Sequence, residues 1–315
     1  MTDNHKTTTT RLLNFFSRLP IPIARFIARS LAGLVNLLRI TKTSETIRLN
    51  IEICFPKLSQ KEREEITKQA IRNELQSYLE FFTVWGGSNQ KNIVRIQGIQ
   101  GEHYFHDAIQ AGKGLVLVVP HFGTWEIMNA WMAQYTKMTI MYEPIKDVGA
   151  DQFVRAARSR ENATLVPTNE SGVRQIFKAL KQGGTTVILP DHSPHHSSEL
   201  IEYFGIPLSS SNLSAKLIQK TKAKALFIHA TRNENDGFDM IIEPIDEEIY
   251  NVDANQGTRI IFKALENLIQ QCPVHYHWSY KRFKANPQLK QIYNIPKHEA
   301  MALVESVRNA SSIEQ

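Results

Sequence analysis

From residue 114 onward the sequence alternates short apolar runs with helical stretches, and this alternation constrains the fold more than any other feature. Six runs have the length and β-branched content of buried strands. They are residues 114–119 (GLVLVV), 139–142, 164–166, 185–189, 225–231 and 239–243. Helical patterns lie between or after them, near 124–135, 148–160, 171–182, 212–222 and 256–271. Such alternation predicts an α/β fold with a mostly parallel central sheet flanked by helices.

The segment before this alternation, residues 43–112, is predicted to be helical. Ser59 and Glu62 have the spacing of a capping box, in which each side chain bonds to the backbone N–H of the other. Apolar residues then recur at helical spacing: Ile66, Ala70, Ile71, Leu75, Leu79 and Phe82. A further helix is expected at 297–307. We therefore divide the chain into an arm (1–42), one main domain (43–285) and a helical tail (286–315).

The N-terminal arm carries the entire excess of positive charge. Residues 1–42 contain seven basic residues and one acidic residue, whereas residues 43–315 contain 30 of each, so the net charge of +6 belongs to the arm. The neutral body has no phosphate-tracking groove signature, which excludes nucleic acid as the expected partner. Cys54 and Cys272 are far apart and have no C-x-x-C spacing, so we expect two reduced thiols rather than a disulfide framework.

The arm is also rich in apolar residues, which predicts contact with a membrane. Arginines interrupt the apolar run and no clean cleavage site follows, so a signal peptide fits poorly. Pro20 and Pro22 break the run, and Arg25 and Arg29 would each cost roughly 2.5–3.5 kcal/mol at mid-bilayer. We therefore expect an amphipathic anchor lying in the membrane interface. The alternative is an ordinary helix packed on the domain.

The sharpest chemical pattern is the segment 118–126 (VVPHFGTWE), in which His121 and Glu126 follow a buried strand. Reactive groups in α/β proteins gather beyond the carboxyl ends of strands. Gly123 and Thr124 supply a turn and a possible helix N-cap, so the two side chains can converge across it. Glu126 could then fix the tautomer of His121, whose other nitrogen takes a proton from a hydroxyl. A purely structural pair is the alternative at this spacing.

Two further groups of residues could bind a ligand. The segment 191–196 (DHSPHH) follows another strand, and Asp191, His192 and His195 together with His121 could be zinc ligands, although no known zinc spacing supports this. A polar loop is the alternative. Basic residues that could hold phosphate or an acidic partner gather on two helices; they are Arg155, Arg158 and Arg160 on one, and Arg174, Lys178 and Lys181 on the other.

In combination these segments resemble a known family. His121 and Glu126 match the H-x4-(D/E) signature of the glycerolipid and lysophospholipid acyltransferases. An ordered series of stretches is similar to the lauroyl/myristoyl branch, the late acyltransferases of lipid A biosynthesis. The stretches are 50–56 (NIEICFP), 141–144 (MYEP), 158–160 (RSR), 171–174 (SGVR) running on to Gly183, 189–192 (LPDH), 203–207 (YFGIP) and 277–283 (HWSYKRF). The resemblance covers roughly residues 10–285.

The resemblance implies an acyltransferase on the cytoplasmic side of a Gram-negative inner membrane. Such an enzyme moves an acyl chain from acyl carrier protein to a hydroxyl of an acylated lipid A precursor. His121 would be the general base and Glu126 its partner. Arg158 and Arg160 would bind sugar phosphates, and Asp191 and Arg174 are assigned to substrate binding. Arg174, Lys178 and Lys181, or alternatively Lys216 and Lys220, could dock the acidic carrier protein. No metal or cofactor is expected.

The sequence departs from the family pattern at three places, and these leave chain length and acceptor position open. His192 stands where the family usually has glutamine, Ala157 where it has a small residue or glycine, and Tyr203-Phe204 where it has a phenylalanine pair. Three other functions are compatible with these residues. They are the same transfer to a glycerophospholipid acceptor, a metal-dependent hydrolase using His121, Asp191, His192 and His195, and a non-catalytic membrane-binding protein.

Overall fold

The computed structural model describes residues 2–38, 41–193 and 199–313. The chain divides into two compact units, which are described one at a time. Unit 1 comprises Met1–Arg29, Gln76–Ile188 and Leu217–Pro244, and unit 2 comprises Ser30–Leu75, Leu189–Lys216 and Ile245–Gln315. Helices α2 (Ile21–Leu38), α4 (Gln60–Gly86) and α10 (Leu213–Thr221) each contribute residues to both units.

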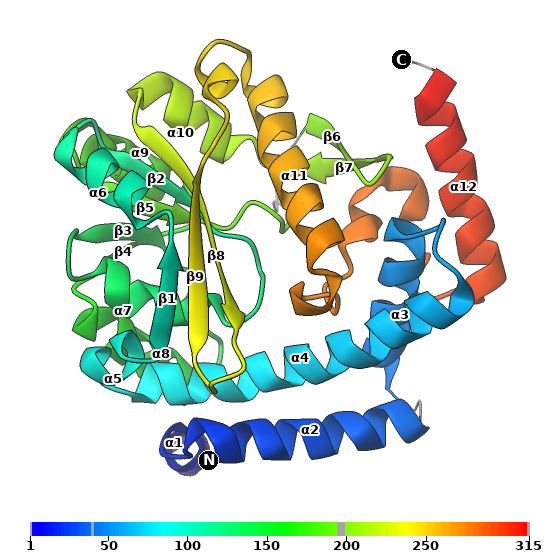
Figure 1. Ribbon diagram of the computed structural model, residues 1–315, viewed down its shortest axis with the longest axis horizontal. Coiled ribbons are helices and arrows are strands. Elements are labelled where there is room, and N and C mark those ends of the chain that lie inside the picture. Colours follow the sequence, from blue (N-terminus) through cyan, green and yellow to red (C-terminus); the bar gives the residue numbers. More distant parts are fainter. Residues whose placement is uncertain (1, 39–40, 194–198, 314–315) are drawn as a thin grey trace. The chain divides into compact units, whose positions relative to one another are not determined.

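Unit 1 contains a seven-stranded sheet that is parallel except for one pair (Figure 1). All six predicted strands are present, so the predicted α/β fold with a mostly parallel sheet is confirmed. In spatial order the strands are β1 (Ile96–Gln100), β9 (Phe238–Pro244), β8 (Lys224–Arg232), β2 (Leu115–Val118), β5 (Thr185–Ile188), β3 (Met138–Met141) and β4 (Thr164–Val166). Only β8 and β9 run antiparallel to each other.

Strand β2 lies at the centre of this sheet, between β5 and β8, and all four of its residues are buried. Val118 at its carboxyl end is level with Ile188 of β5 and Phe227 of β8. Strand β8 continues beyond that level to Arg232, so its last residues flank the chain that leaves β2. The register thus places the segment with His121 at the carboxyl edge of the sheet, as predicted.

The helices of unit 1 follow the predicted pattern. Helix α8 (Val148–Arg160) has the predicted bounds, and the side chain of Asp147 caps it by accepting from the N–H of Ala150. Helix α9 (Glu170–Lys181) is capped in the same way by Asn169. Other helical elements of this unit are α1 (Thr2–Ser17), α5 (Asn89–Ile93), α6 (Glu102–Gln110), the 3₁₀ turn η1 (Trp125–Ile127) and α7 (Met128–Met132).

The prediction that residues 43–112 are helical throughout is wrong at 96–100. This stretch forms β1, which pairs only with β9, in parallel. Its sequence, IQGIQ, is short and contains Gly98, so it lacks the apolar run that identified the central strands. The remainder of the segment is helical as expected, and the capping box of α4 is confirmed: the N–H of Ser59 donates to Oε2 of Glu62 at 2.7 Å.

Unit 2 is built from helices and one antiparallel hairpin. Strands β6 (Glu199–Tyr203) and β7 (Ile206–Ser210) were not predicted as strands. The two residues of their turn, Phe204 and Gly205, have φ of 49° and 74°. Turns of this kind usually contain Asn-Gly or Asp-Gly, so the sequence Phe-Gly gave no hairpin signal. The helical elements are α3 (Lys42–Cys54), η2 (Glu247–Tyr250), α11 (Ala254–Gln271), η3 (Pro273–His275), η4 (Arg282–Ala285), η5 (Pro287–Leu289) and α12 (Lys297–Ile313), the last containing the predicted 297–307 helix.

The two cysteines of unit 2 are free, as predicted. Cys54 is buried. Its burial, and to a smaller extent the nearby Glu266 carboxylate, raises the pKa of its thiol well above the ordinary value. Cys272 is only half-buried, so it is not the core thiol that was expected.

Candidate functional site

The segment that follows β2 turns sharply at Gly123. Gly123 has φ of 56°, and a Cβ at this position would lie 2.4 Å from the carbonyl oxygen of Ala230 on β8. Only glycine therefore fits this turn without displacing the backbone of the neighbouring strand. The turn separates His121 from Glu126, which is the local geometry expected from the sequence.

The two residues at the start of this turn are oriented differently. His121 is partly accessible, and its ring lies edge-on to that of Trp125, with centroids 4.8 Å apart. Phe122 is completely buried beside His229, with ring centroids 5.5 Å apart. An imidazole that is accessible at the carboxyl edge of the sheet can exchange a proton with a bound hydroxyl group.

Glu126 is almost completely buried and is held by two donors from other positions of unit 1. Nη2 of Arg158 donates to Oε1 of Glu126 at 2.7 Å, and Nδ2 of Asn129 donates to Oε2 at 3.0 Å. Nη1 of Arg158 donates to Oε2 of Glu161 at 3.1 Å, so the guanidinium bridges two carboxylates. The side chains of Arg158 and Glu161 are only 11% and 4% exposed, and so this bridge is shielded from water.

This cluster alters the ionisation of its members. Burial, opposed by the attraction of Arg158 and aided by the neighbouring Glu126, raises the pKa of Glu161 to about 7. Burial lowers the pKa of Arg158, but the two carboxylates outweigh it and the pKa is raised overall. Arg158 therefore remains a cation, while Glu161 changes its charge near neutral pH.

Asn129 and Glu161 were not among the predicted site residues. Asn129 follows Glu126 by three residues, and Glu161 follows Arg158 by three, a spacing that brings side chains together on a helix. No sequence signal connects Glu161 to Glu126.

Arg160 and Arg174 lie apart from Arg158. On helix α8, Arg158 and Arg160 are two residues apart and so point about 200° apart. Arg160 is exposed, and its Nη2 donates to the carbonyl of Trp85 at the end of α4. Arg174 forms a solvated pair with Glu170, with 3.5 Å between Nη1 and Oε2 and side chains 72% and 93% exposed.

Asp191 belongs to unit 2 and is buried there, with 1% of its surface exposed. Burial, together with the neighbouring Asp191 carboxylate, raises the pKa of Tyr276 well above its ordinary value. His192 stacks on the ring of Tyr280, with centroids 3.9 Å apart and planes at 20°. The hydroxyl of Tyr280 accepts from the N–H of Ser193 at 3.1 Å. The 191–193 segment therefore has a defined conformation within its unit.

The segment 277–283 (HWSYKRF) supports that conformation. Nη1 of Arg282 donates to the hydroxyl of Ser193 at 2.9 Å, and its Nη2 donates to that of Ser210 at 2.6 Å. Nδ2 of Asn50 donates to the carbonyls of Trp278 and Tyr280 at 2.7 and 2.9 Å. Three of the stretches that suggested the family thus meet in unit 2.

The predicted zinc ligand His195, and His196 beside it in the sequence, lie outside the described residues. Within residues 2–38, 41–193 and 199–313, no group of three or more His, Cys, Asp or Glu side chains is arranged to hold a metal ion.

Helix α2 of the arm has an apolar face that is exposed and an opposite face that is buried. The exposed face carries large apolar side chains: Ile23, Phe26, Leu31, Leu34, Leu37 and Leu38. The buried face carries mainly small residues, Ala24, Ala28 and Ala32, with Ile21 and Arg25. Pro20 precedes the helix, but Pro22 lies in its first turn, where its missing N–H costs nothing, so Pro22 does not interrupt the apolar run as was expected.

By length and composition, Ile21–Leu38 is the one helix among the described residues that could cross a membrane. Yet Arg25 is only 3% exposed and forms an ion pair with Glu80, with 2.6 Å between Nε and Oε1. Helix α2 thus buries Arg25 against the protein and exposes its large apolar side chains.

Comparison with known proteins gives consistent matches over most of the chain. The family model for bacterial lipid A biosynthesis acyltransferases matches residues 10–285. The lipid A biosynthesis palmitoleoyltransferase of Escherichia coli (strain K12) is 25% identical over 274 residues, covering 86% of this chain and 88% of the relative. The lauroyltransferase of the same organism is 22% identical, with the same coverage. A phosphatidylinositol mannoside acyltransferase of Mycolicibacterium smegmatis is 26% identical over 142 residues, 44% of this chain and 46% of the relative.

Proposed function

The chain belongs to the family of bacterial lipid A biosynthesis acyltransferases, and we propose that it transfers a fatty acyl chain from acyl carrier protein to a hydroxyl of an acylated lipid A precursor. It is an acyltransferase, as its family membership shows. The observation that carries the proposal is the partly accessible His121 at the carboxyl edge of the sheet, across a tight turn from the buried, firmly held Glu126.

In the proposed reaction, His121 is the general base. The acceptor oxygen bonds to the thioester carbonyl carbon while its proton passes to the imidazole. The tetrahedral intermediate then collapses, the C–S bond breaks, and the proton is returned to the carrier thiolate. Proton transfer of this kind contributes typically 10²–10⁴ in rate, and no covalent acyl-enzyme is needed.

Glu126 is proposed to orient His121 and to stabilise its protonated form. A carboxylate has about four lone-pair positions, so Glu126 can accept from an imidazole while it binds Arg158 and Asn129. Those two donors restrict its rotation and fix the direction in which the remaining lone pairs point. Pre-organisation of this kind costs no rearrangement during the reaction.

We propose different roles for Arg158, Arg160 and Arg174. Arg158, bridged between two carboxylates, positions Glu126, although its guanidinium could also reach an acceptor phosphate. Arg160 is exposed and is the better candidate for binding sugar phosphates. Arg174 lies on the exposed basic face of α9 with Lys178 and Lys181, which suits docking of an acidic carrier protein. Asp191 is retained as a substrate-binding residue.

The arm is proposed to hold the enzyme on the cytoplasmic face of the inner membrane. The exposed apolar face of α2 would enter the interface, and basic residues of the arm other than the buried Arg25 would attract anionic lipid at about 1 kcal/mol each. This location would give the enzyme access to an acceptor that is itself a membrane lipid.

The test is a transfer assay with the purified full chain in detergent. Acyl carrier protein charged with a fatty acid is mixed with a tetra-acylated lipid A precursor, and the product is examined by mass spectrometry. A mass increase of one acyl chain supports the proposal. A parallel reaction with a lysoglycerophospholipid tests the second acceptor class, which the partial similarity to a phosphatidylinositol mannoside acyltransferase makes worth including. Transfer to that acceptor alone would overturn the assignment of lipid A.

A further inference from the structure

A completely buried carboxylate lies beneath the turn that carries His121 and Glu126. It belongs to Glu80 on α4, whose side chain has no exposed surface. Oε1 accepts from Nε of Arg25 at 2.6 Å and from Nε of Arg232 at 2.9 Å. Oε2 accepts from Nε of Arg232 at 3.0 Å, and Nη2 of the same arginine lies 2.8 Å from it. Three segments that are distant in sequence, all within unit 1, therefore meet at one side chain.

The same carboxylate is bonded to the turn itself. Thr124 occupies the N-cap position of η1, as predicted, but its side chain makes no capping hydrogen bond: the hydroxyl donates to Oε2 of Glu80 instead. Nη2 of Arg232 donates to the Thr124 hydroxyl at 3.1 Å and to Ser77 at 2.6 Å. Thr124 is completely buried and lies between His121 and Glu126 in the chain. Its side chain thus fastens the middle of the turn to the interior.

Arg25 is the contribution of the N-terminal arm to this cluster. It lies on α2 between Ile23 and Phe26, both of which are exposed, yet only 3% of its own side chain is exposed. Nη1 of Arg25 also donates to Oδ1 of Asp236 at 3.0 Å, in the turn between β8 and β9. Arg25 is therefore directed inward, while Ile23 and Phe26 beside it on the helix present apolar surface.

The cluster keeps its central charge. Burial opposes ionisation of Glu80, but Arg232, Arg25 and the Thr124 hydroxyl outweigh it, and the pKa of Glu80 is lowered. Removing one partner of such a buried group leaves other charges uncompensated, which is far more costly than losing an exposed pair. The position of Glu80, and through it that of Thr124, therefore depends on both arginines.

We infer that Glu80 is a positioning residue for the turn from His121 to Glu126, and that Arg25 makes the N-terminal arm a part of the active-site scaffold. This inference rests on the proposed function, because it takes the turn to be the catalytic segment. It adds a second role to the arm, which would support catalysis from within unit 1 as well as binding the membrane. Loss of the arm should then impair chemistry even where no membrane is needed.

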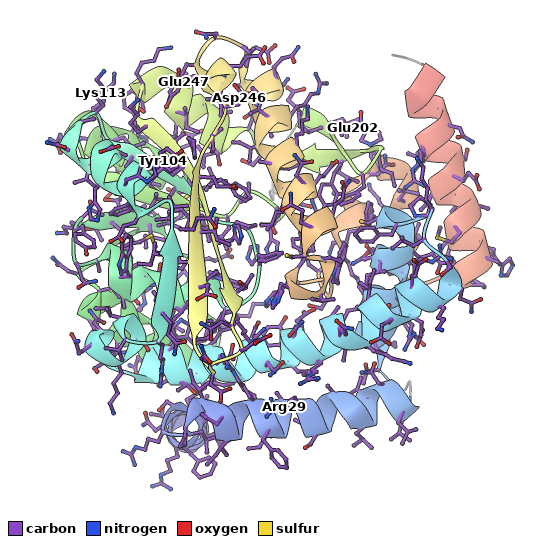
Figure 2. All side chains as sticks on the ribbon, viewed as in Figure 1. Arg29, Tyr104, Lys113, Glu202, Asp246 and Glu247 are labelled. Carbon is purple, nitrogen blue, oxygen red and sulfur yellow. The ribbon has the colours of Figure 1, made fainter. Side chains whose placement is uncertain are left out.

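The first experiment compares Arg25→Met with Arg29→Met in the full chain. Arg29, labelled in Figure 2, lies on the same helix and is exposed, so its replacement controls for loss of charge from the arm. Activity is measured with detergent-dispersed acceptor, so that membrane binding does not limit the rate. We expect Arg25→Met to lower kcat about tenfold with little change in acceptor KM, as loss of a charge-assisted contact predicts. Arg29→Met should leave kcat unchanged.

The second experiment alters the turn itself, and it remains decisive if Arg25→Met fails to fold. Thr124→Val removes the hydroxyl but keeps the shape, whereas Thr124→Ser keeps the hydroxyl. We expect kcat to fall about tenfold in Thr124→Val and to be largely retained in Thr124→Ser. Equal kcat in the valine variant and the natural enzyme would overturn the inference, as would equal kcat in Arg25→Met and Arg29→Met.

A readout that needs no substrate separates this inference from the proposed function. The NMR signal of the ¹³Cε1-labelled His121 imidazole is followed against pH in the natural chain and both sets of variants. A titration curve that moves in Thr124→Val and Arg25→Met, but not in Thr124→Ser and Arg29→Met, supports the positioning role even if no acyl transfer is found. An unchanged curve in all four variants would overturn the positioning role even if the natural chain is active.

Discussion

Arg158 and Glu126, 32 residues apart in the sequence, form a buried ion pair with 2.7 Å between Nη2 and Oε1. This pair joins helix α8 to the segment that follows β2. It means that the arginine proposed from sequence as a phosphate ligand is bonded to the carboxylate proposed as the partner of the catalytic histidine.

Removing His121 or Glu126 should have non-additive effects on transfer. We expect His121→Ala and Glu126→Gln each to lower kcat by at least about 10²-fold, because the base and its partner act together. The double variant should then lose little more than the worse single variant. Steady-state kinetics on the three purified variants, each checked for a native melting temperature, provide the measurement. If the double loss equals the product of the single losses, the two residues act independently and the dyad is wrong.

Chelation should leave the reaction unaffected, because the proposed mechanism uses a general base and no metal ion. The purified enzyme is dialysed against EDTA and assayed with and without added zinc. Activity that disappears on dialysis and returns with zinc would instead favour a metal-dependent site.

Arg158 and Arg160 should differ in what their loss changes. Arg158→Ala leaves two buried carboxylates without their shared cation, a change that typically costs about 3–5 kcal/mol of stability. We expect a lower melting temperature and a lower kcat. Arg160→Ala should raise the acceptor KM about tenfold with little effect on melting, if Arg160 binds phosphate. Thermal unfolding measures the melting temperature of each variant, and acceptor titrations measure its kcat and KM. An acceptor KM that Arg160→Ala leaves unchanged would show that Arg160 does not bind the phosphate.

Glu161 should make stability depend on pH near neutrality. Its pKa is raised to about 7 in the folded chain, above the ordinary value, so the folded state binds the proton more tightly than the unfolded state. The resulting stabilisation is present at low pH and is lost as pH rises toward 7. Glu161→Gln lacks this titration, and so its stability relative to the natural chain should increase between pH 5 and pH 8. Denaturant unfolding at both values tests this.

The control for that experiment is Glu170→Gln. Glu170 is 93% exposed and pairs with Arg174 at the surface, so its removal should leave the pH dependence nearly unchanged. If Glu161→Gln follows the natural chain at both pH values, the titration belongs to another group.

Membrane binding should depend on the exposed face of α2. Replacing Phe26 and Leu34, which are 64% and 51% exposed, by glutamate places charge in the apolar face while leaving Arg25 in place. We expect flotation with anionic phospholipid vesicles to fall sharply and the melting temperature to stay the same. High salt should weaken binding by the natural chain only in part, because apolar insertion is not screened. Full flotation of the double variant would place the contact elsewhere.

Much of the fold was predictable because the central strands are buried on both faces. A strand such as β2, in which every residue is buried, must be apolar throughout, and this leaves a clear run in the sequence. The edge strand β1 and the hairpin at Phe204-Gly205 lack such runs, so they were missed. The position of His121 after β2 followed from the same reasoning, because the end of a buried parallel strand is a fixed place in an α/β fold.

The sequence by itself thus determined the class of fold, the bounds of helices such as α8, the segment that carries His121 and Glu126, and the family resemblance. Only the tertiary structure decided which partners those residues have. Arg158 reaches Glu126, Arg25 reaches Glu80, and Arg232 reaches both Glu80 and Thr124, across separations of 32 to 152 residues. The physical reason is that hydrophobic periodicity reports the burial of each residue along one element. The pairing of buried charges depends instead on which elements the order of strands and the packing of helices bring together.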